Sequence, residues 1–271
     1  MALGTDATFV EPDYPRLERV EIRLVKLPPA LDGFTIAQLS DFHYDPYFSV
    51  TPIKAGIEMV NELKPDLVVL TGDFATMPLP ESRRHHNRQA LRAVEPCAAL
   101  LRSLQAPGGV FAILGNHDFS FGPEGVVEAL QSQGIPVLRN QSVLIEKNGG
   151  RFWLAGLDDV LGRQANLDDA LQKVPNGETT VVLCHEPDFA DVVAMRSVDL
   201  QISGHSHGGQ VRLPVVGALY LPPLGQKYPW GLRRLGSMQL YTNCGIGTVN
   251  LPIRWNCPPE VTLFTLRSGR S

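Results

Sequence analysis

The segment "DLVVLTGD", residues 66–73, joins an aliphatic run to an abrupt glycine and aspartate. A run of aliphatic and β-branched residues without polar alternation predicts a strand buried on both faces. The pattern recurs in "FTIAQLSD", "GVFAILGN", "TTVVLCH" and "VDLQISGH", which end at Asp41, Asn116, His185 and His205. Sites in open α/β sheets form beyond the carboxyl ends of the strands, so we expect these polar residues to meet at one edge.

Helical segments are predicted between the strands. They are residues 52–63, with Thr51 as N-cap and a proline at N1; residues 88–104, bent or split at Pro96; residues 123–133; and residues 167–173. A β-rich tail follows at residues 210–266. Strands that alternate with helices predict an α/β fold whose sheets carry helices on the outside.

The chain is predicted to form one domain. Residues 1–30 are rich in proline and charge and indicate an extended lead-in, with one strand at residues 20–25. Residues 31–271 contain no internal repeat and no linker between two cores, so they are assigned to a single domain.

Composition excludes several classes of protein. The 271 residues are 44% hydrophobic and 19% charged, which is typical of a globular protein with a sizeable core. The net charge is −4 and no dense Lys/Arg run occurs, so nucleic acid is not an expected partner. The four cysteines lack a C-x-x-C spacing, which disfavours a zinc ribbon or a disulfide framework and predicts buried thiols. Cys184 is expected to point away from His185, because side chains alternate along a strand.

No apolar run reaches transmembrane length, and residues 1–14 lack the basic start and apolar core of a signal peptide. The chain as given is therefore expected to be soluble. Two locations follow for the natural protein: cytoplasmic, or membrane-associated or extracytoplasmic if an export signal or anchor has been trimmed.

Taken singly, each polar segment has a structural explanation. Asp41 can cap a turn, Asp73 can form an Asx turn, and His185 can be a hydrogen-bonded core residue. The segment "GNHD", which contains His117 and Asp118, is more suggestive, and "GHSH" at residues 204–207 is the strongest single piece. His85 and His86 lie in a polar stretch far from any predicted strand end and are not expected to bind metal.

Together the segments predict a metal centre. Their oxygen and nitrogen donors include no thiolate, and such a set suits Mn, Fe, Zn, Co or Ni, with manganese as the first expectation. The donors exceed what one tetrahedral ion needs and match two ions that share a bridging carboxylate. They are Asp41, His43, Asp73, Asn116, His185, His205 and His207.

In this order, "SDFH", "TGDF", "GNHD", "CHEPD" and "GHSH" resemble the five motifs of the calcineurin-like metallophosphoesterase superfamily. The tail segments "GHSHGGQVRLP" and "YTNCGIGTVNLPIRWNCPPEVTLFTL" resemble its YaeI-like and YkuE-like bacterial phosphodiesterases. The resemblance covers nearly the whole chain. It implies a four-layered α/β/β/α sandwich of two mixed sheets flanked by helices.

The resemblance also implies a role for each residue. Asp41, His43 and His207 would hold the first metal, Asn116, His185 and His205 the second, and Asp73 would bridge both. A hydroxide between the two ions would attack the phosphorus in line with the leaving group, and His117 would protonate that group as general acid. Asp118 would orient His117. Gly204 and Gly208 would let the backbone pass close to the ions and the phosphate.

The absence of arginine near two of the motifs indicates the class of substrate. The segments after Asp73 and Asn116 contain no arginine that could bind the additional negative charge of a phosphomonoester. A phosphodiester or pyrophosphate diester is therefore the expected small-molecule substrate. Residues 212–236 form a Pro- and Gly-rich loop that either lines a pocket or packs on the sheets. The residues considered for such a pocket are Tyr220, Tyr228, Trp230, Arg233 and Arg234.

Three other functions stay open. One is a pyrophosphohydrolase of a nucleotide-linked lipid precursor of the UDP-diacylglucosamine type, as in some relatives, which would bring a lipid-linked substrate and peripheral membrane association. The second is a phosphomonoesterase. The third is a non-catalytic scaffold, which is disfavoured because every family position carries a competent residue.

Overall fold

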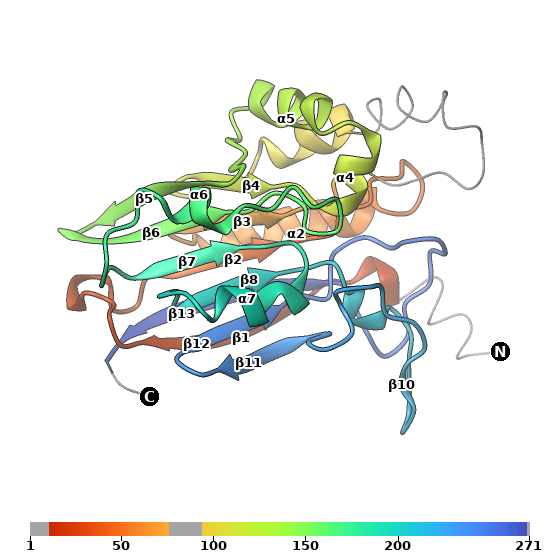
Figure 1. Ribbon diagram of the computed structural model, residues 1–271. Coiled ribbons are helices and arrows are strands. Elements are labelled where there is room, and N and C mark those ends of the chain that lie inside the picture. The colour runs from red at the N-terminus through yellow and green to blue at the C-terminus, as the bar shows by residue number, and fades with distance from the viewer. Residues whose placement is uncertain (1–10, 76–93, 270–271) are drawn as a thin grey trace.

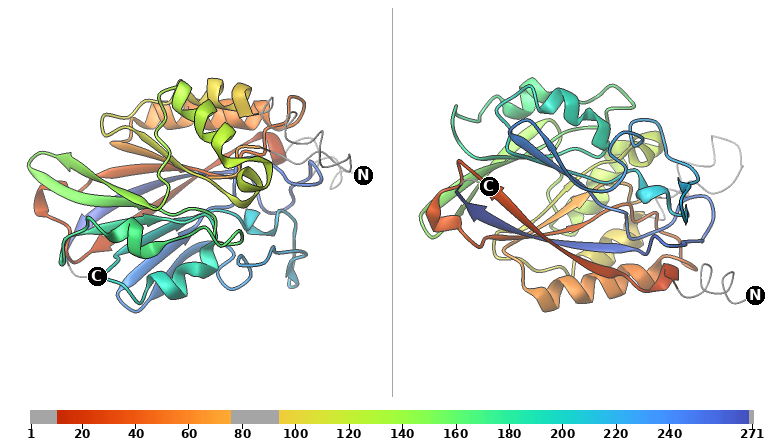
Figure 2. Two further views of the ribbon diagram at one scale, coloured as in Figure 1. Left: turned by 45° about the horizontal axis from the view of Figure 1, so that its top comes forward. Right: turned by 90° about the horizontal axis from the view of Figure 1, so that it is seen from below.

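Two β-sheets stack face to face at the centre of the computed structural model, and helices cover the outer face of each sheet (Figures 1 and 2). The structure describes residues 11–75 and 94–269. Both sheets contain parallel and antiparallel pairs. The expected four-layered sandwich of two mixed sheets between helices is therefore confirmed.

The first sheet has the strand order β1-β13-β2-β3-β4. Its strands are β1 (Arg16–Leu24), β13 (Glu260–Ser268), β2 (Thr35–Leu39), β3 (Leu67–Thr71) and β4 (Val110–Ile113). The strands β2, β3 and β4 run parallel, so their carboxyl ends share one edge. Strand β1 begins before the expected strand at residues 20–25 and pairs with β13 along its whole length.

The second sheet has the order β11-β12-β8-β7-β6-β5. Its strands are β5 (Gln141–Lys147), β6 (Gly150–Gly156), β7 (Thr180–Leu183), β8 (Leu200–Ser203), β11 (Gly231–Leu235) and β12 (Met238–Thr242). A short hairpin of β9 (Arg212–Leu213) and β10 (Gly217–Ala218) leaves the body of the protein, at the lower right of Figure 1. All five expected buried strands are present at the predicted places.

The structure contains the helices α2 (Val50–Leu63), α4 (Asn116–Phe121), α5 (Pro123–Ser132), α6 (Leu167–Leu171) and α7 (Ala190–Val193). The predicted helices at residues 52–63, 123–133 and 167–173 are confirmed with shifted ends as α2, α5 and α6, whereas α4 and α7 were not predicted. The helix α2 begins at Val50, so the prediction of Thr51 as N-cap and Pro52 at N1 is wrong. Ser49 precedes the helix, and its hydroxyl hydrogen-bonds to Asp45 and not to the helix. Residues 94–101 are helical, with Pro96 near their start, whereas the earlier part of the predicted helix lies outside the described residues. No helix of residues 11–75 and 94–269 is long and apolar enough to span a bilayer.

Three apolar layers hold the four structural layers together. One lies between the first sheet and its helices, and contains Ile57 and Leu70. The second lies between the two sheets and contains Phe152. The third contains Cys184 and Val193, on the outer side of the second sheet. Cys184 thus points away from the centre, and all four cysteines are buried as predicted.

Candidate metal centre

The backbone of the expected donors is left-handed at five positions. These residues are Asp41, His43, Asp73, His205 and His207, with φ between 39° and 70°. Few non-glycine residues adopt this conformation, and the surrounding structure must hold it in place. The Asp41 N–H donates to the Gly72 carbonyl and the His43 N–H to the Asp73 carbonyl, each at 2.9 Å. The turns beyond β2 and β3 therefore fix one another.

The first group of donors comprises Asp41, His43 and His207, whose candidate ligand atoms lie within 4.8 Å of one another. The Nε2 atoms of His43 and His207 are 3.0 Å apart. The His207 Nε2 atom is 3.4 Å from Asp41 Oδ1. Two ring nitrogens and a carboxylate oxygen thus face a common point, as ligands of one cation do.

The second group comprises Asp73, His185 and His205. His185 Nδ1 lies 2.6 Å from the Thr71 carbonyl oxygen, so Nδ1 carries the proton of this contact. The other ring nitrogen, Nε2, is left free and lies 3.2 Å from Asp73 Oδ2. His205 uses its Nε2–H on the Pro223 carbonyl, at 2.8 Å, and leaves Nδ1 free. Such carbonyl contacts fix the tautomer of a metal-binding histidine.

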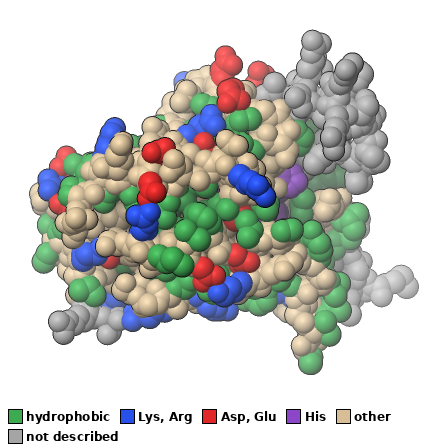
Figure 3. Space-filling view, viewed as in Figure 1, with side chains coloured by type: hydrophobic (Ala, Val, Ile, Leu, Met, Phe, Trp, Pro, Cys, Tyr) green, Lys and Arg blue, Asp and Glu red, His purple; other side chains and the backbone are tan. Residues whose placement is uncertain are grey.

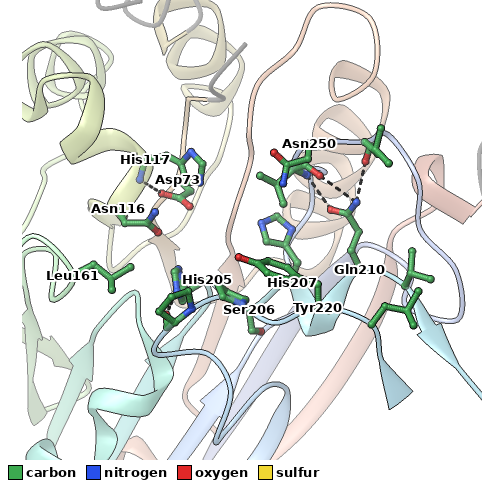
Figure 4. Close-up of a pocket in the computed structure, with 17 residues that line it drawn as sticks. Asp73, Asn116, His117, Leu161, His205, Ser206, His207, Gln210, Tyr220 and Asn250 are labelled. Carbon is green, nitrogen blue, oxygen red and sulfur yellow. Dashed lines mark hydrogen bonds between the residues drawn. The ribbon is translucent and has the colours of Figure 1, made fainter. Parts of the chain in front are cut away.

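Asp73 lies between the two groups. Its Oδ2 atom is 3.2 Å from His185 Nε2 and 3.5 Å from His43 Nε2, so one oxygen faces both groups. Its Oδ1 atom accepts the His117 backbone N–H at 2.9 Å (Figure 4). The carboxylate is therefore placed as a bridge between two ions would be.

Several buried donor atoms lack a hydrogen-bond partner within the described residues. Around Asp73 these are Asn116 Oδ1, His185 Nε2 and His205 Nδ1. An unsatisfied buried polar atom is costly, and most such atoms in proteins have a partner. A divalent cation with oxygen and nitrogen ligands would satisfy all three, so the residues present fit such a group.

The pKa shifts of the site's residues do not all run in the same direction. Burial lowers the pKa of His43 to about 3 and that of His205 to about 4, which keeps both rings neutral. Burial opposes ionisation of Asp73, but His185 and His117 outweigh burial and hold the pKa of Asp73 well below its usual value. Burial raises the pKa of Asp41 to about 6. Burial opposes protonation of His185, but Asp73 and Asp41 outweigh burial and hold the pKa of His185 well above its usual value. The buried carboxylates therefore attract positive charge to this place.

Asp118 makes different contacts from those expected. Its carboxylate accepts the backbone N–H groups of Asp73 at 2.8 Å, Gly115 at 2.9 Å and Phe74 at 2.9 Å, so it ties the turns after β3 and β4 together. None of these hydrogen bonds involves the His117 ring, and the role of Asp118 in orienting this ring stays a prediction. Backbone amides occupy both carboxylate oxygens.

The two glycines of the last motif differ. A Cβ atom on Gly204 would collide with Ser40 Oγ and Asp41 Oδ2, so the backbone there passes close to an expected donor, while its approach to the ions stays a prediction. A Cβ atom on Gly208 would instead collide with the Arg212 guanidinium. Gly208 therefore makes room for an arginine behind the site and not for an ion or a phosphate.

A cavity of about 440 Å³ opens over the donors (Figure 4). Its base includes Asp73, Asn116, His117, His205 and His207. Its walls are largely apolar, and the described residues that line it include no lysine or arginine. The apolar wall residues are Leu161, Val211, Leu219, Tyr220, Pro222, Pro223, Val249 and Leu251.

Of the loop residues considered for a pocket, Tyr220 lines this cavity. Tyr228 packs on the outer core of the second sheet and donates to Asp191, and Trp230 stacks on Arg212. Arg233 and Arg234 belong to β11 and are absent from the cavity lining. His85 and His86 lie outside the described residues.

Arg254 stabilises a loop behind the site, a role that could not be predicted from the sequence. Its side chain is fully buried and donates to the carbonyls of Cys244, Gly245 and Gly247. Gly247 in turn donates its N–H to the Asp41 carbonyl at 2.8 Å. Arg254 therefore braces the loop that supports Asp41. A lone arginine in "LPIRWN" has no spacing that would predict this role.

A two-sheet sandwich with buried carboxylate, imidazole and amide donors at a shared edge defines the class of metallophosphoesterases. The chain belongs to the calcineurin-like phosphoesterase family, whose model matches residues 34–209. It is therefore a metal-dependent phosphoric ester hydrolase.

Relatives extend the match to nearly the whole chain. The metallophosphoesterase YkuE of Bacillus subtilis is 37% identical over 97% of this chain and 89% of its own. The phosphodiesterase YaeI of Escherichia coli is 32% identical over 95% of this chain and 90% of its own. The solved structure of Haemophilus influenzae NAD nucleotidase aligns with a TM-score of 0.50 at 17% identity, over 79% of this chain and 45% of that chain. This last likeness shows the shared fold alone.

Removing divalent metal with a chelator is expected to lower the Tm, because the buried carboxylates of Asp41 and Asp73 would lose their counter-charge. A ligand at about a hundred times its Kd contributes about 2.7 kcal/mol of stability. For a chain of this size that corresponds to a drop of roughly 5–10 °C. Thermal melts with chelator, and after metal is restored, measure the shift. A Tm that responds to neither treatment would contradict the assignment of a metal centre.

Proposed function

We propose that this protein hydrolyses phosphodiesters at a centre of two divalent metal ions. Bound ions of this kind lower the pKa of a shared water and offset charge on the phosphoryl oxygens. Asp73 lies between the two groups of donors and completes both. The residues proposed to hold the ions are Asp41, His43 and His207 for one, and Asn116, His185 and His205 for the other.

The observation that carries this proposal is the convergence of unpartnered buried donors on the Asp73 carboxylate. Metal analysis of the purified protein is the direct test, and two equivalents per chain are expected, with manganese as the first candidate. Protein that binds no divalent metal and cleaves no activated diester would support a scaffold instead.

His117 is proposed as the general acid. Its ring lines the cavity and lies edge-on to His43, with ring centres 4.8 Å apart. Its backbone N–H is held by Asp73, while the ring Nδ1 atom has no partner within the described residues. The imidazole can therefore deliver a proton to the oxygen that leaves phosphorus.

A diester is favoured over a monoester because the described cavity lining carries no arginine or lysine. A dianionic monoester would lack a charge-assisted partner of the kind that contributes about 1.5–3 kcal/mol. We expect kcat/KM for bis(p-nitrophenyl) phosphate to exceed that for p-nitrophenyl phosphate by at least about tenfold. A higher value for the monoester would overturn the preference.

The cavity rim supports a second candidate, a pyrophosphate diester with a lipid arm. Leu219, Tyr220 and Leu251 line the cavity and are 59%, 66% and 58% exposed. Apolar side chains at the mouth of a site could receive an acyl chain. Figure 3 shows apolar side chains gathered around the hairpin that carries β10, which adjoins this rim.

Leu219→Ser tests the role of the rim. We expect it to lower kcat/KM for diesters with long acyl arms by roughly fivefold, equivalent to about 1 kcal/mol of lost apolar contact. Rates with a methyl-armed diester should not change. Met195→Ser is the matched control, because Met195 is 79% exposed and does not line the cavity over the metal centre. Equal losses on both diesters would argue against apolar recognition.

A further inference from the structure

Two cysteines lie behind the metal centre. Cys244 follows β12 and Cys257 precedes β13. Both sulfurs converge on Gly208. The Cys257 Sγ atom is 3.8 Å from the Gly208 carbonyl oxygen, and a Cβ atom on Gly208 would lie 2.8 Å from the Cys244 Sγ atom. The two thiols therefore form a pair that distant sequence positions bring together.

Two arginines and the buried carboxylate of Glu260 surround the pair, and a cavity reaches it from outside. Arg212 Nη2 lies 3.0 Å from Cys244 Sγ, and Arg254 Nη1 lies 4.0 Å from Cys257 Sγ. A second, smaller cavity of about 160 Å³ is lined by both cysteines and Arg212. Cys97 and Cys184, in contrast, belong to the apolar cores on the outer faces of the sheets. A small oxidant that enters this cavity meets two sulfurs and a guanidinium.

We propose that Cys244 and Cys257 form an oxidisable site at which a hydroperoxide generates an intramolecular disulfide. One sulfur takes the terminal peroxide oxygen, the O–O bond breaks, and the thiol proton leaves with the first water or alcohol. The second sulfur then displaces the new hydroxyl group, which takes the second thiol proton and leaves as water. The two thiols lose two electrons in total, and the peroxide gains them.

The pair contacts the metal-binding segment directly. The Cys257 thiol donates to the His207 carbonyl at 3.2 Å, and Arg212 Nε donates to the Gly208 carbonyl at 2.7 Å. A disulfide removes the first of these donors. Oxidation should therefore loosen the segment that carries His207 and weaken metal binding, a consequence that rests on the proposed function.

The chemical step is tested by thiol mapping, which needs neither metal nor activity. Reduced protein is treated with hydrogen peroxide, alkylated in denaturant, digested and analysed by mass spectrometry. We expect a peptide that links residues 244 and 257, with Cys97 and Cys184 still alkylated, and reversal by dithiothreitol. Cys244→Ser should abolish the linked peptide and Cys97→Ser should not. Alkylation of all four cysteines after peroxide treatment would overturn the proposal.

The consequence for the metal centre is measured separately. Zinc is the probe because it has no redox chemistry of its own. We expect oxidised wild-type protein to bind zinc at least about tenfold more weakly than reduced protein, in line with effects of lost contacts behind metal ligands. Oxidant-treated Cys244→Ser should match its reduced form. If the disulfide forms and zinc affinity stays constant, the link to His207 is wrong. If reduced protein binds no zinc, the proposed function fails while the thiol result stands.

Discussion

Asp73→Asn is expected to remove most bound metal and to reduce kcat on the order of a thousandfold. Asp73 Oδ2 faces both His43 and His185, so the carboxylate contributes to both groups of donors. An amide in its place carries no negative charge and can direct an N–H toward the ions. The affinities for both metal ions should therefore fall together.

Metal content by mass spectrometry and kcat on an activated diester measure this effect. Asp168→Asn is a suitable control, because it removes a carboxylate whose side chain is 73% exposed and pairs with Arg196. Excess metal should restore part of the activity of Asp73→Asn, since the other donors stay. A variant that keeps two equivalents of metal and full activity would show that Asp73 is not a bridge.

His117→Ala is expected to retain metal and lose activity in proportion to the basicity of the leaving group. A positioned general acid contributes about 100- to 10,000-fold to rate. The full loss should be seen with alkyl esters, whose leaving oxygen needs a proton. It should be much smaller with p-nitrophenyl esters, because p-nitrophenolate leaves without one.

Rates across a series of leaving groups, together with metal analysis, separate this role from a structural one. His117→Gln serves as a second variant, because it fills more of the ring's volume without an acidic proton. Full activity of either variant on alkyl esters would remove His117 from the role of acid. Loss of metal from these variants would indicate that His117 is a metal ligand and not the general acid.

The strands and the assembly of the site could be predicted because both depend on local patterns. The run ending at Asp73 is buried on both faces, and so is the run ending at His205. The carboxyl ends of parallel strands meet by geometry, so a polar residue after each run must approach the others. The structure places all seven expected donors at this edge, although their roles remain proposals.

What could not be predicted depends on contacts between distant segments. Asp118 faces four backbone N–H groups, from Asp73, Phe74, Ala75 and Gly115, and a sequence does not show where an amide points. The buried position of Arg254 follows from the carbonyls of a loop that only the folded chain assembles. The parallel pairing of β1 with β13 joins the two ends of the chain, which no local pattern encodes.

The division of the donors between two sheets has a consequence for biosynthesis. Asp41, His43, Asp73 and Asn116 follow strands of the first sheet, whereas His185, His205 and His207 follow strands of the second. A growing chain that has emerged only as far as β6 already has the donors His43, Asp73 and His117, but it lacks the second-sheet histidines of both proposed ion sites. Both proposed ion sites are complete only when β8 and the turn beyond it have left the ribosome and joined the sheet. On the proposed function, the loading of both ions is therefore expected to finish late in folding.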